Sequence, residues 1–246
     1  MATTQPTALG LPAAITACLF DLDGVLTPTA ALHQRAWKEM FDAFLSERGG
    51  PNLQTPFTSE DYNLYVDGKP RQEGIRSFLQ SRGIELPERA GPGEDSLQSL
   101  GERKQAIVVR LLDTEGVTPY PGSVRFATEV RRAGLSSAVV SSSANCRRVL
   151  HAARIDGLFD AVVDGEVAAR RKLAGKPAPD TFLEGARLLG VAPAAAAVFE
   201  DALAGVEAGR AGGFGYVVGV DRVHHAQALR EHGADTVVSD LSELLR

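Results

Sequence analysis

Short apolar runs alternate with amphipathic stretches along most of this chain. The first run ends at Phe20 and predicts a buried strand within residues 15–20. After residue 117, strands are expected at LSSAVV (135–140), FDAVVD (159–164), AAAVFE (195–200), FGYVVGV (214–220) and DTVV (235–238). Helical spacing lies between them, near 122–133, 145–153, 179–190, 203–211 and 224–232. Strands that alternate with helices of about ten residues predict an α/β fold, a Rossmann-like doubly wound parallel sheet with helices on both faces.

Residues 30–116 interrupt this alternation. Apolar residues recur at helical spacing from Ala30 to about Ser46, and further helices are expected near 59–66, 71–81 and 96–113, with no strand among them. Gly- and Pro-rich segments at 47–58 and 87–95 are typical of loops. We therefore predict a core domain of residues 1–29 and 117–246 with an inserted all-helical domain of residues 30–116. Residues 1–14, with Pro6 and Pro12, are expected to be a loose leader.

Size and composition narrow the class of protein. The 246 residues are 44% hydrophobic and 23% charged, as is usual for a soluble globular protein. A net charge of −5 without a long basic run argues against nucleic acid as a partner. No stretch approaches the ~18 apolar residues of a membrane span, and the N-terminal residues lack the features of a signal peptide. Cys18 and Cys146 are far apart and show no metal-ligand spacing, so a reducing, cytoplasmic location is expected.

The first strand leads directly into Asp21-Leu22-Asp23-Gly24. Side chains two apart on an extended backbone point the same way, so Asp21 and Asp23 are expected on one side and Leu22 on the other. Two carboxylates about 4 Å apart repel by roughly 4 kcal/mol at an effective dielectric constant near 20. A cation must offset this repulsion, and oxygen ligands favour Mg²⁺. An acidic turn or a calcium loop is the alternative interpretation of this stretch.

Polar residues also follow the other expected strands. They are Ser141-Ser142-Ser143-Ala144-Asn145, Asp164-Gly165 and Glu200-Asp201, and a loop at Gly175–Asp180 adds Lys176. Ligands of open parallel sheets bind beyond the carboxyl ends of the strands. These groups are therefore expected to gather at one edge of the sheet. Gly205 and Gly209, four apart on the following helix, are expected to permit close packing on the sheet.

Four motifs, in this order, resemble the haloacid dehalogenase superfamily and, within it, the β-phosphoglucomutase-like group of phosphotransferases. They are FDLDGVLT, VVSSSAN, GKPAPDTF and VFEDALAGVEAGRAG, and the resemblance covers nearly the whole chain from Ile15 onward. It implies phosphoryl transfer with Mg²⁺ on a small phosphorylated sugar, by a monomer or weak homodimer.

The resemblance assigns roles to the core residues. Asp21 is similar to the nucleophile that becomes an aspartyl phosphate, and Asp23 to the general acid/base, whose backbone carbonyl is also expected on the metal. Lys176 would neutralise the charge shared by Asp21 and the phosphate. Asp201 would bind Mg²⁺ directly, with Glu200 as a second ligand or acting through water. Ser141 would donate to a phosphoryl oxygen, and substrate contacts are expected from Ser142, Ser143 and Asn145; an ordinary helix-capping serine is the alternative.

The helical insert resembles the cap of this group. Arg71 would hold a second, non-transferring phosphate, because a guanidinium suits phosphate oxygens. His33 is expected near the substrate, with a core or surface histidine as the alternative. The remaining candidate substrate contacts are Thr29, Trp37, Gly68, Lys69 and Lys104. Asp180 is expected to start a helix.

Two departures from the group favour a phosphatase, whereas Arg71 and the long cap favour a mutase. Ala144 stands where these mutases usually carry a lysine that grips the distal phosphate, and Asp67 stands where a lysine is more usual in the cap. Candidate substitutes are Arg147, Arg148, Lys69 and Arg170. Mutase chemistry between β-glucose 1-phosphate and glucose 6-phosphate is the leading hypothesis, with sugar-phosphate hydrolysis as the alternative. A non-catalytic phosphometabolite-binding protein fits less well, since the expected reactive groups are present, and so does a dehalogenase, which does not need the Asp23 acid.

Overall fold

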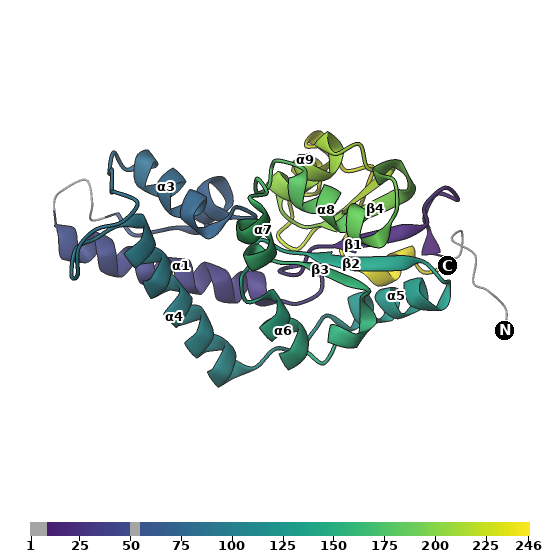
Figure 1. The fold of residues 1–246 in the computed structure, drawn as a ribbon, viewed down its shortest axis with the longest axis horizontal. Coiled ribbons are helices and arrows are strands. Elements are labelled where there is room, and N and C mark those ends of the chain that lie inside the picture. The colour runs from purple at the N-terminus through teal and green to yellow at the C-terminus, as the bar shows by residue number, and fades with distance from the viewer. Residues whose placement is uncertain (1–8, 50–54) are drawn as a thin grey trace. The chain divides into compact units, whose positions relative to one another are not determined.

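The structure is a computed structural model that describes residues 9–49 and 55–246. The chain divides into two compact units. The sheet unit is the chain up to Pro28 together with Val117–Arg246, and the helical unit is Thr29–Gly116. Figure 1 shows the strands of the first and the helices α1, α3 and α4 of the second. The parts of the expected leader and loop at residues 1–8 and 50–54 lie outside the described residues.

Six parallel strands form the sheet, in the order β3-β2-β1-β4-β5-β6. They are β1 (Ala17–Phe20), β2 (Ser136–Val140), β3 (Ala161–Val163), β4 (Ala196–Glu200), β5 (Tyr216–Val220) and β6 (Thr236–Val238). Ala17 pairs with Ser136 of β2 on one side and with Ala196 of β4 on the other. The strand order reverses between β1 and β4, which is where sheets of this kind bind ligands.

Helices cover both faces of this sheet. They are α5 (Pro121–Arg132), α6 (Cys146–Ala152), α7 (Gly165–Arg171), α8 (Asp180–Leu189), α9 (Leu203–Ala211) and α10 (Ala226–Glu231), with 3₁₀ turns η3 (Asp156–Leu158), η4 (Pro193–Ala195) and η5 (Leu241–Leu244). Alternate residues of β1 serve the two faces. Leu19 packs in a cluster with Phe182 of α8, whereas Phe20 stacks on Phe199 and meets Phe126 of α5 edge-on.

The helical unit has an aromatic core of its own. Its elements are α1 (Thr29–Arg48), α2 (Ser59–Asp61), a π-helical turn η2 (Tyr62–Val66), α3 (Arg71–Ser81) and α4 (Leu97–Glu115). Phe41 lies 4.2 Å from Phe78 and 5.1 Å from Phe57 between ring centroids. Phe57 is 1% exposed although it lies in a segment without regular structure. The described residues of this unit contain no strand.

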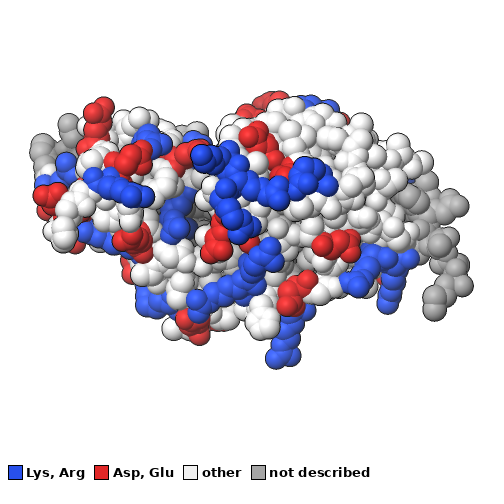
Figure 2. Space-filling model, viewed as in Figure 1, with Lys and Arg blue, Asp and Glu red and all other residues white. Residues whose placement is uncertain are grey.

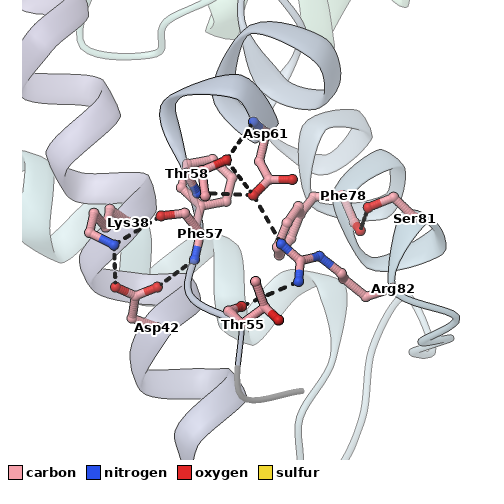
Figure 3. Close-up of polar contacts among 9 residues, drawn as sticks. All are labelled: Lys38, Asp42, Thr55, Phe57, Thr58, Asp61, Phe78, Ser81 and Arg82. Atoms are coloured by element: carbon pink, nitrogen blue, oxygen red, sulfur yellow. Dashed lines mark hydrogen bonds and ion pairs between the residues drawn. The ribbon is translucent and has the colours of Figure 1, made fainter. Parts of the chain in front are cut away.

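Two residues of α1, Lys38 and Asp42, form hydrogen bonds with the backbone of Phe57. The Asp42 carboxylate accepts from the Phe57 amide at 2.8 Å and from Lys38 Nζ at 2.8 Å, and Lys38 also donates to the Phe57 carbonyl at 2.9 Å (Figure 3). A charged pair thus satisfies both backbone groups of a residue whose ring is buried. The segment gains a defined position without a helix or strand.

Arg82 holds the same segment from the end of α3. Its Nη2 donates to Asp61 at 2.9 Å and its Nη1 to the Thr55 carbonyl at 3.2 Å (Figure 3). Its guanidinium carbon lies 5.0 Å from the Phe78 ring centroid. Asp61 also completes a capping box with Thr58 at the start of α2. Arg82 therefore holds both ends of the segment 55–61.

The structure differs from the sequence-based expectations in three places. Leu9 and Leu11, within the expected loose leader, are buried. The helix expected at 59–66 is a single turn of α2 that continues into the π-helical turn. Helix α7 was not expected, because its seven residues bury only Val167 and show no helical period. Asp180 does start a helix, α8. Among the described residues no helix is long and apolar enough to cross a membrane.

Candidate active site

Three carboxylates meet where β1 and β4 end. The amide of Asp21 donates to the Phe199 carbonyl at 2.9 Å, so the pairing of β1 with β4 extends to this residue. Glu200 is the last residue of β4, and Asp201 follows it. One oxygen from each of the three side chains lies within 4.8 Å of the other two. The sheet edge therefore presents a compact set of oxygen donors.

Lys176 lies between two of these carboxylates. Its Nζ donates to Asp21 Oδ1 at 2.6 Å, to Glu200 Oε1 at 2.5 Å and to the Val140 carbonyl at 3.2 Å. The side chain is 1% exposed, and the nitrogen lies 4.8 Å from the Phe182 ring centroid. Burying one charge is costly unless it is paired, and this ammonium is paired on both sides.

The electrostatics of this group follow from its burial. Burial raises the pKa of Asp21 well above its usual value, and Glu200 and Asp23 add to the rise while Lys176 opposes it. For Lys176, burial alone lowers the pKa, but the two carboxylates outweigh it and the pKa is raised. The lysine is therefore held in its charged form. A group of several acids around one lysine retains negative charge, which suits an additional cation.

The donor set fits Mg²⁺. Hard divalent cations prefer carboxylate oxygens, and Mg²⁺ usually combines one or two carboxylates with water and phosphate oxygens. Asp21 and Asp201 would hold it, with Glu200 as a further donor beside the lysine. Two glycines make room for these acids: a Cβ on Gly24 would lie 1.8 Å from Asp201 Oδ2, and one on Gly205 would lie 1.8 Å from Glu200 Oε1.

Glu200 and Asp201 come closer together than strand alternation predicts. Alternation would direct adjacent side chains to opposite faces, yet both reach the same group of oxygens. The reason is that β4 ends at Glu200 and the chain bends at Asp201. Glu200 also accepts from the Ala202 amide at 2.9 Å, so its carboxylate is held between this loop and Lys176.

The loop after β2 contacts Asp23, the second acid of the Asp21-Leu22-Asp23 (DxD) motif. Ser141 Oγ, 1% exposed, donates to Asp23 Oδ2 at 3.5 Å. It also accepts from the Ser143 amide at 3.1 Å, and Ser143 Oγ accepts from the Asn145 amide at 3.1 Å. Ser142 is half-buried in the same loop. Ser141 and Ser143 thus each accept a local backbone hydrogen bond, and Ser141 also contacts Asp23.

In the helical unit, the structure brings three predicted substrate residues together. Lys104 Nζ lies 2.8 Å from His33 Nδ1 and 4.8 Å from the Trp37 ring centroid. All three are buried, and His33 and Trp37 are neighbours on α1 while Lys104 lies on α4. An ammonium has only donors, so a charged Lys104 requires His33 Nδ1 to accept. Thr29, the first residue of α1, is buried as well.

The other predicted cap residues make further contacts within the helical unit. Arg71 Nη1 donates to the Gly101 carbonyl at 2.9 Å and to Gln105 Oε1 at 3.0 Å, and burial lowers its pKa. Lys69 donates to Ser77 Oγ at 3.2 Å. Gly68 has a φ of +68°, which the turn before α3 needs. The substrate contacts of these residues stay predictions.

Known proteins resemble this chain throughout its length. Residues 15–213 match the haloacid dehalogenase-like hydrolase family. The chain belongs to this family. A β-phosphoglucomutase of Mycobacterium bovis is 54% identical over 246 positions, covering 96% of this chain and 94% of the relative. Hexitol phosphatase A of Escherichia coli is 32% identical over 227 positions, covering 92% and 91%. The crystal structure of β-phosphoglucomutase from Clostridium difficile, 26% identical, superposes with a TM-score of 0.76 over 94% of this chain and 93% of that one.

The predicted family and fold class are therefore confirmed. As a member of the haloacid dehalogenase family's β-phosphoglucomutase-like group, the protein is a phosphotransfer enzyme. The hydrogen bond between Lys176 and Glu200 was not predicted from the sequence. It joins a loop to the end of a strand, and the two residues belong to separate motifs whose patterns do not imply a contact. The contact between His33 and Lys104 was not predicted either.

Ala144 stands where the group usually has a lysine. Of the residues considered as substitutes for that lysine, Arg147 and Arg148 lie on α6 and Arg170 lies on α7, whereas Lys69 lies in the helical unit. Arg147 Nε donates to Asp164 at 2.9 Å, and Arg148 and Arg170 are exposed. Figure 2 shows Lys and Arg side chains gathered over these helices, with acidic side chains between them. Arg147 is thus already paired with Asp164, which caps the N-terminus of α7.

Proposed function

We propose that this protein transfers a phosphoryl group on a small sugar phosphate through an aspartyl phosphate at Asp21, with Mg²⁺ as cofactor. The favoured reaction is that of a β-phosphoglucomutase, converting β-glucose 1-phosphate to glucose 6-phosphate. The observation that carries the proposal is Lys176, buried between Asp21 and Glu200 beside Asp201. The 54% identity to a β-phosphoglucomutase along almost the whole chain supports the choice of reaction.

In the first half-reaction, an oxygen of Asp21 attacks phosphorus and the bond from phosphorus to the sugar oxygen breaks. Asp23 gives its proton to that leaving oxygen. In the second half-reaction, Asp23 takes the proton of an acceptor hydroxyl, whose oxygen attacks the aspartyl phosphate and releases Asp21. Lys176 opposes the rise in the pKa of Asp21 and orients its carboxylate, and Ser141 holds Asp23 and can donate to a phosphoryl oxygen. Bound Mg²⁺ would supply charge neutralisation for the phosphoryl oxygens.

A phosphatase differs only in the acceptor, because water rather than a sugar hydroxyl would attack the aspartyl phosphate. The relative named hexitol phosphatase A, together with Ala144 and Asp67, favours this second candidate. The mutase is preferred because the relative of higher identity carries that name.

The test supplies β-glucose 1-phosphate, glucose 1,6-bisphosphate and Mg²⁺ and follows glucose 6-phosphate and inorganic phosphate together. We expect glucose 6-phosphate to form with little inorganic phosphate. Inorganic phosphate as the sole product would replace the mutase with the phosphatase. An Asp21→Asn variant should lose about 10⁴-fold or more of either activity, and full activity in this variant would exclude the covalent mechanism.

A further inference from the structure

One arginine outside the reaction centre connects the loop of the DxD motif to two other segments of the sheet unit. Arg222, two residues beyond β5, donates from Nε to the Gly24 carbonyl at 2.8 Å and from Nη1 to the Ser239 carbonyl at 2.6 Å. Its guanidinium carbon lies 3.7 Å from the Tyr120 ring centroid. Asp240 lies 3.9 Å from Nη1, and the arginine side chain is 17% exposed.

The Gly24 backbone lies directly against Asp201, the predicted metal ligand. Its φ is +91°, and a Cβ there would overlap the Asp201 carboxylate. The Gly24 amide donates to the Thr27 carbonyl at 2.7 Å. Gly24 is therefore held by its amide within its own turn and by its carbonyl from Arg222. Displacement of this residue would change the space available to Asp201.

We propose that Arg222 is a positioning residue for the metal site: by fixing the Gly24 carbonyl, it keeps the Gly24 backbone where the Asp201 carboxylate needs it. This inference rests on the proposed function, since it takes Asp201 as a Mg²⁺ ligand. The guanidinium is suited to this role. Two of its nitrogens are bonded to backbone carbonyls of different segments, and the Tyr120 ring stacks against its plane. Its remaining nitrogen, Nη2, is buried and has no hydrogen-bond partner among the described residues.

A purely structural tether would make the same contacts, so the test needs a matched arginine. Arg210 provides one in the same unit. Its Nε and Nη2 donate to the Gly233 carbonyl at 3.1 and 2.8 Å, and Nη2 also pairs with Asp235 at 2.7 Å. Arg210 thus also joins a backbone carbonyl and an acid from another segment, and these bonds go to Gly233 and Asp235 rather than to the loop of Asp21 to Gly24. Replacing either arginine should lower stability, whereas only Arg222 should affect the metal.

The experiment measures Mg²⁺ binding to the whole protein by isothermal titration calorimetry, without substrate, for the wild type, Arg222→Gln and Arg210→Gln. Thermal unfolding of each is recorded alongside. We expect Arg222→Gln to weaken Mg²⁺ binding about tenfold and Arg210→Gln to leave it within twofold of the wild type. In the activity assay, Arg222→Gln should raise the Mg²⁺ concentration for half-activation by a similar factor. Arg222→Lys, which keeps a charged donor, should recover part of the affinity.

Equal Mg²⁺ affinity in the wild type and Arg222→Gln would overturn the positioning role. A wild type that binds no Mg²⁺ would instead contradict the proposed function, so the two failures are distinct. If Arg222→Gln does not fold, Arg222→Lys is compared with Arg210→Lys. Weaker Mg²⁺ binding in Arg222→Lys alone supports the inference, and equal binding in both overturns it.

Discussion

Lys176 in the sheet unit and Lys104 in the helical unit are the two buried lysines among the described residues, and their surroundings differ. Lys176 is held by the carboxylates of Asp21 and Glu200 at 2.6 and 2.5 Å. Lys104 lies against the rings of His33 and Trp37. Removing the first leaves two acids unopposed, whereas removing the second takes one cation away from two aromatic rings. From this comparison we propose that Lys176 serves the chemical step and Lys104 serves substrate binding.

The largest effect is expected from Lys176→Met. Without the ammonium, Asp21 and Glu200 repel each other and the charge on the phosphoryl group loses its partner, so kcat should fall about 10³-fold. Steady-state kinetics at saturating substrate measures this, with Lys172→Met as the control, since Lys172 is exposed at the end of α7. A kcat within tenfold of the wild type would contradict the assignment of Lys176 to the chemical step.

Glu200→Gln should have the next largest effect. The amide keeps the shape of Glu200 but removes the charge that Lys176 and the Ala202 amide contact, so we expect kcat to fall roughly 100-fold. Glu207→Gln on α9, half-exposed beside His232, is the control and should retain full activity. If both variants behave alike, Glu200 does not orient the lysine.

A smaller effect, of a different kind, is expected from Lys104→Met. Because we propose that Lys104 donates to the substrate, its loss should raise KM about tenfold and leave kcat nearly unchanged. Arg103→Met, the exposed neighbour on α4, is the control. A large fall in kcat with constant KM would end the distinction between the two lysines.

The smallest effect concerns stability within the helical unit. Arg82→Gln removes a pair whose side chains are each 15% exposed, and should lower the free energy of unfolding by about 1 kcal/mol. Arg76→Gln breaks an ion pair with Glu88 that is much more exposed and should cost less than about 0.5 kcal/mol. Urea denaturation compares the two. Equal losses would show that burial of the Arg82 pair adds nothing.

The sequence predicted the sheet well because its strands are short, apolar and bounded by motifs. The strand expected at 195–200 is β4 at Ala196–Glu200, and the role expected for Gly209 is confirmed, since a Cβ there would lie 3.2 Å from Val217. The resemblance to the family also named Lys176 before the structure paired it with Asp21. These predictions succeed where one local pattern determines the outcome.

The contacts that were not predicted join distant segments without a shared pattern. Lys104 meets His33 across 71 positions of sequence, and Arg222 meets Gly24 across 198. Neither pair is implied by periodicity, because each depends on how two elements pack. The π-helical turn at 62–66 was missed for a related reason: its side-chain pattern is close to that of an α-helix over one turn.

The position of β1 in the sheet has a consequence for how the chain is made. Ala17 leaves the ribosome early, but its partners Ser136 and Ala196 are synthesised only after the whole helical unit. That unit can close its aromatic core around Phe41 and Phe78 while β1 is still unpaired. The hydrogen bond from the Tyr120 amide to the Leu26 carbonyl then joins the segments that precede and follow the helical unit. The edge of the sheet that carries Asp21 and Asp201 thus cannot assemble until β4 has been synthesised.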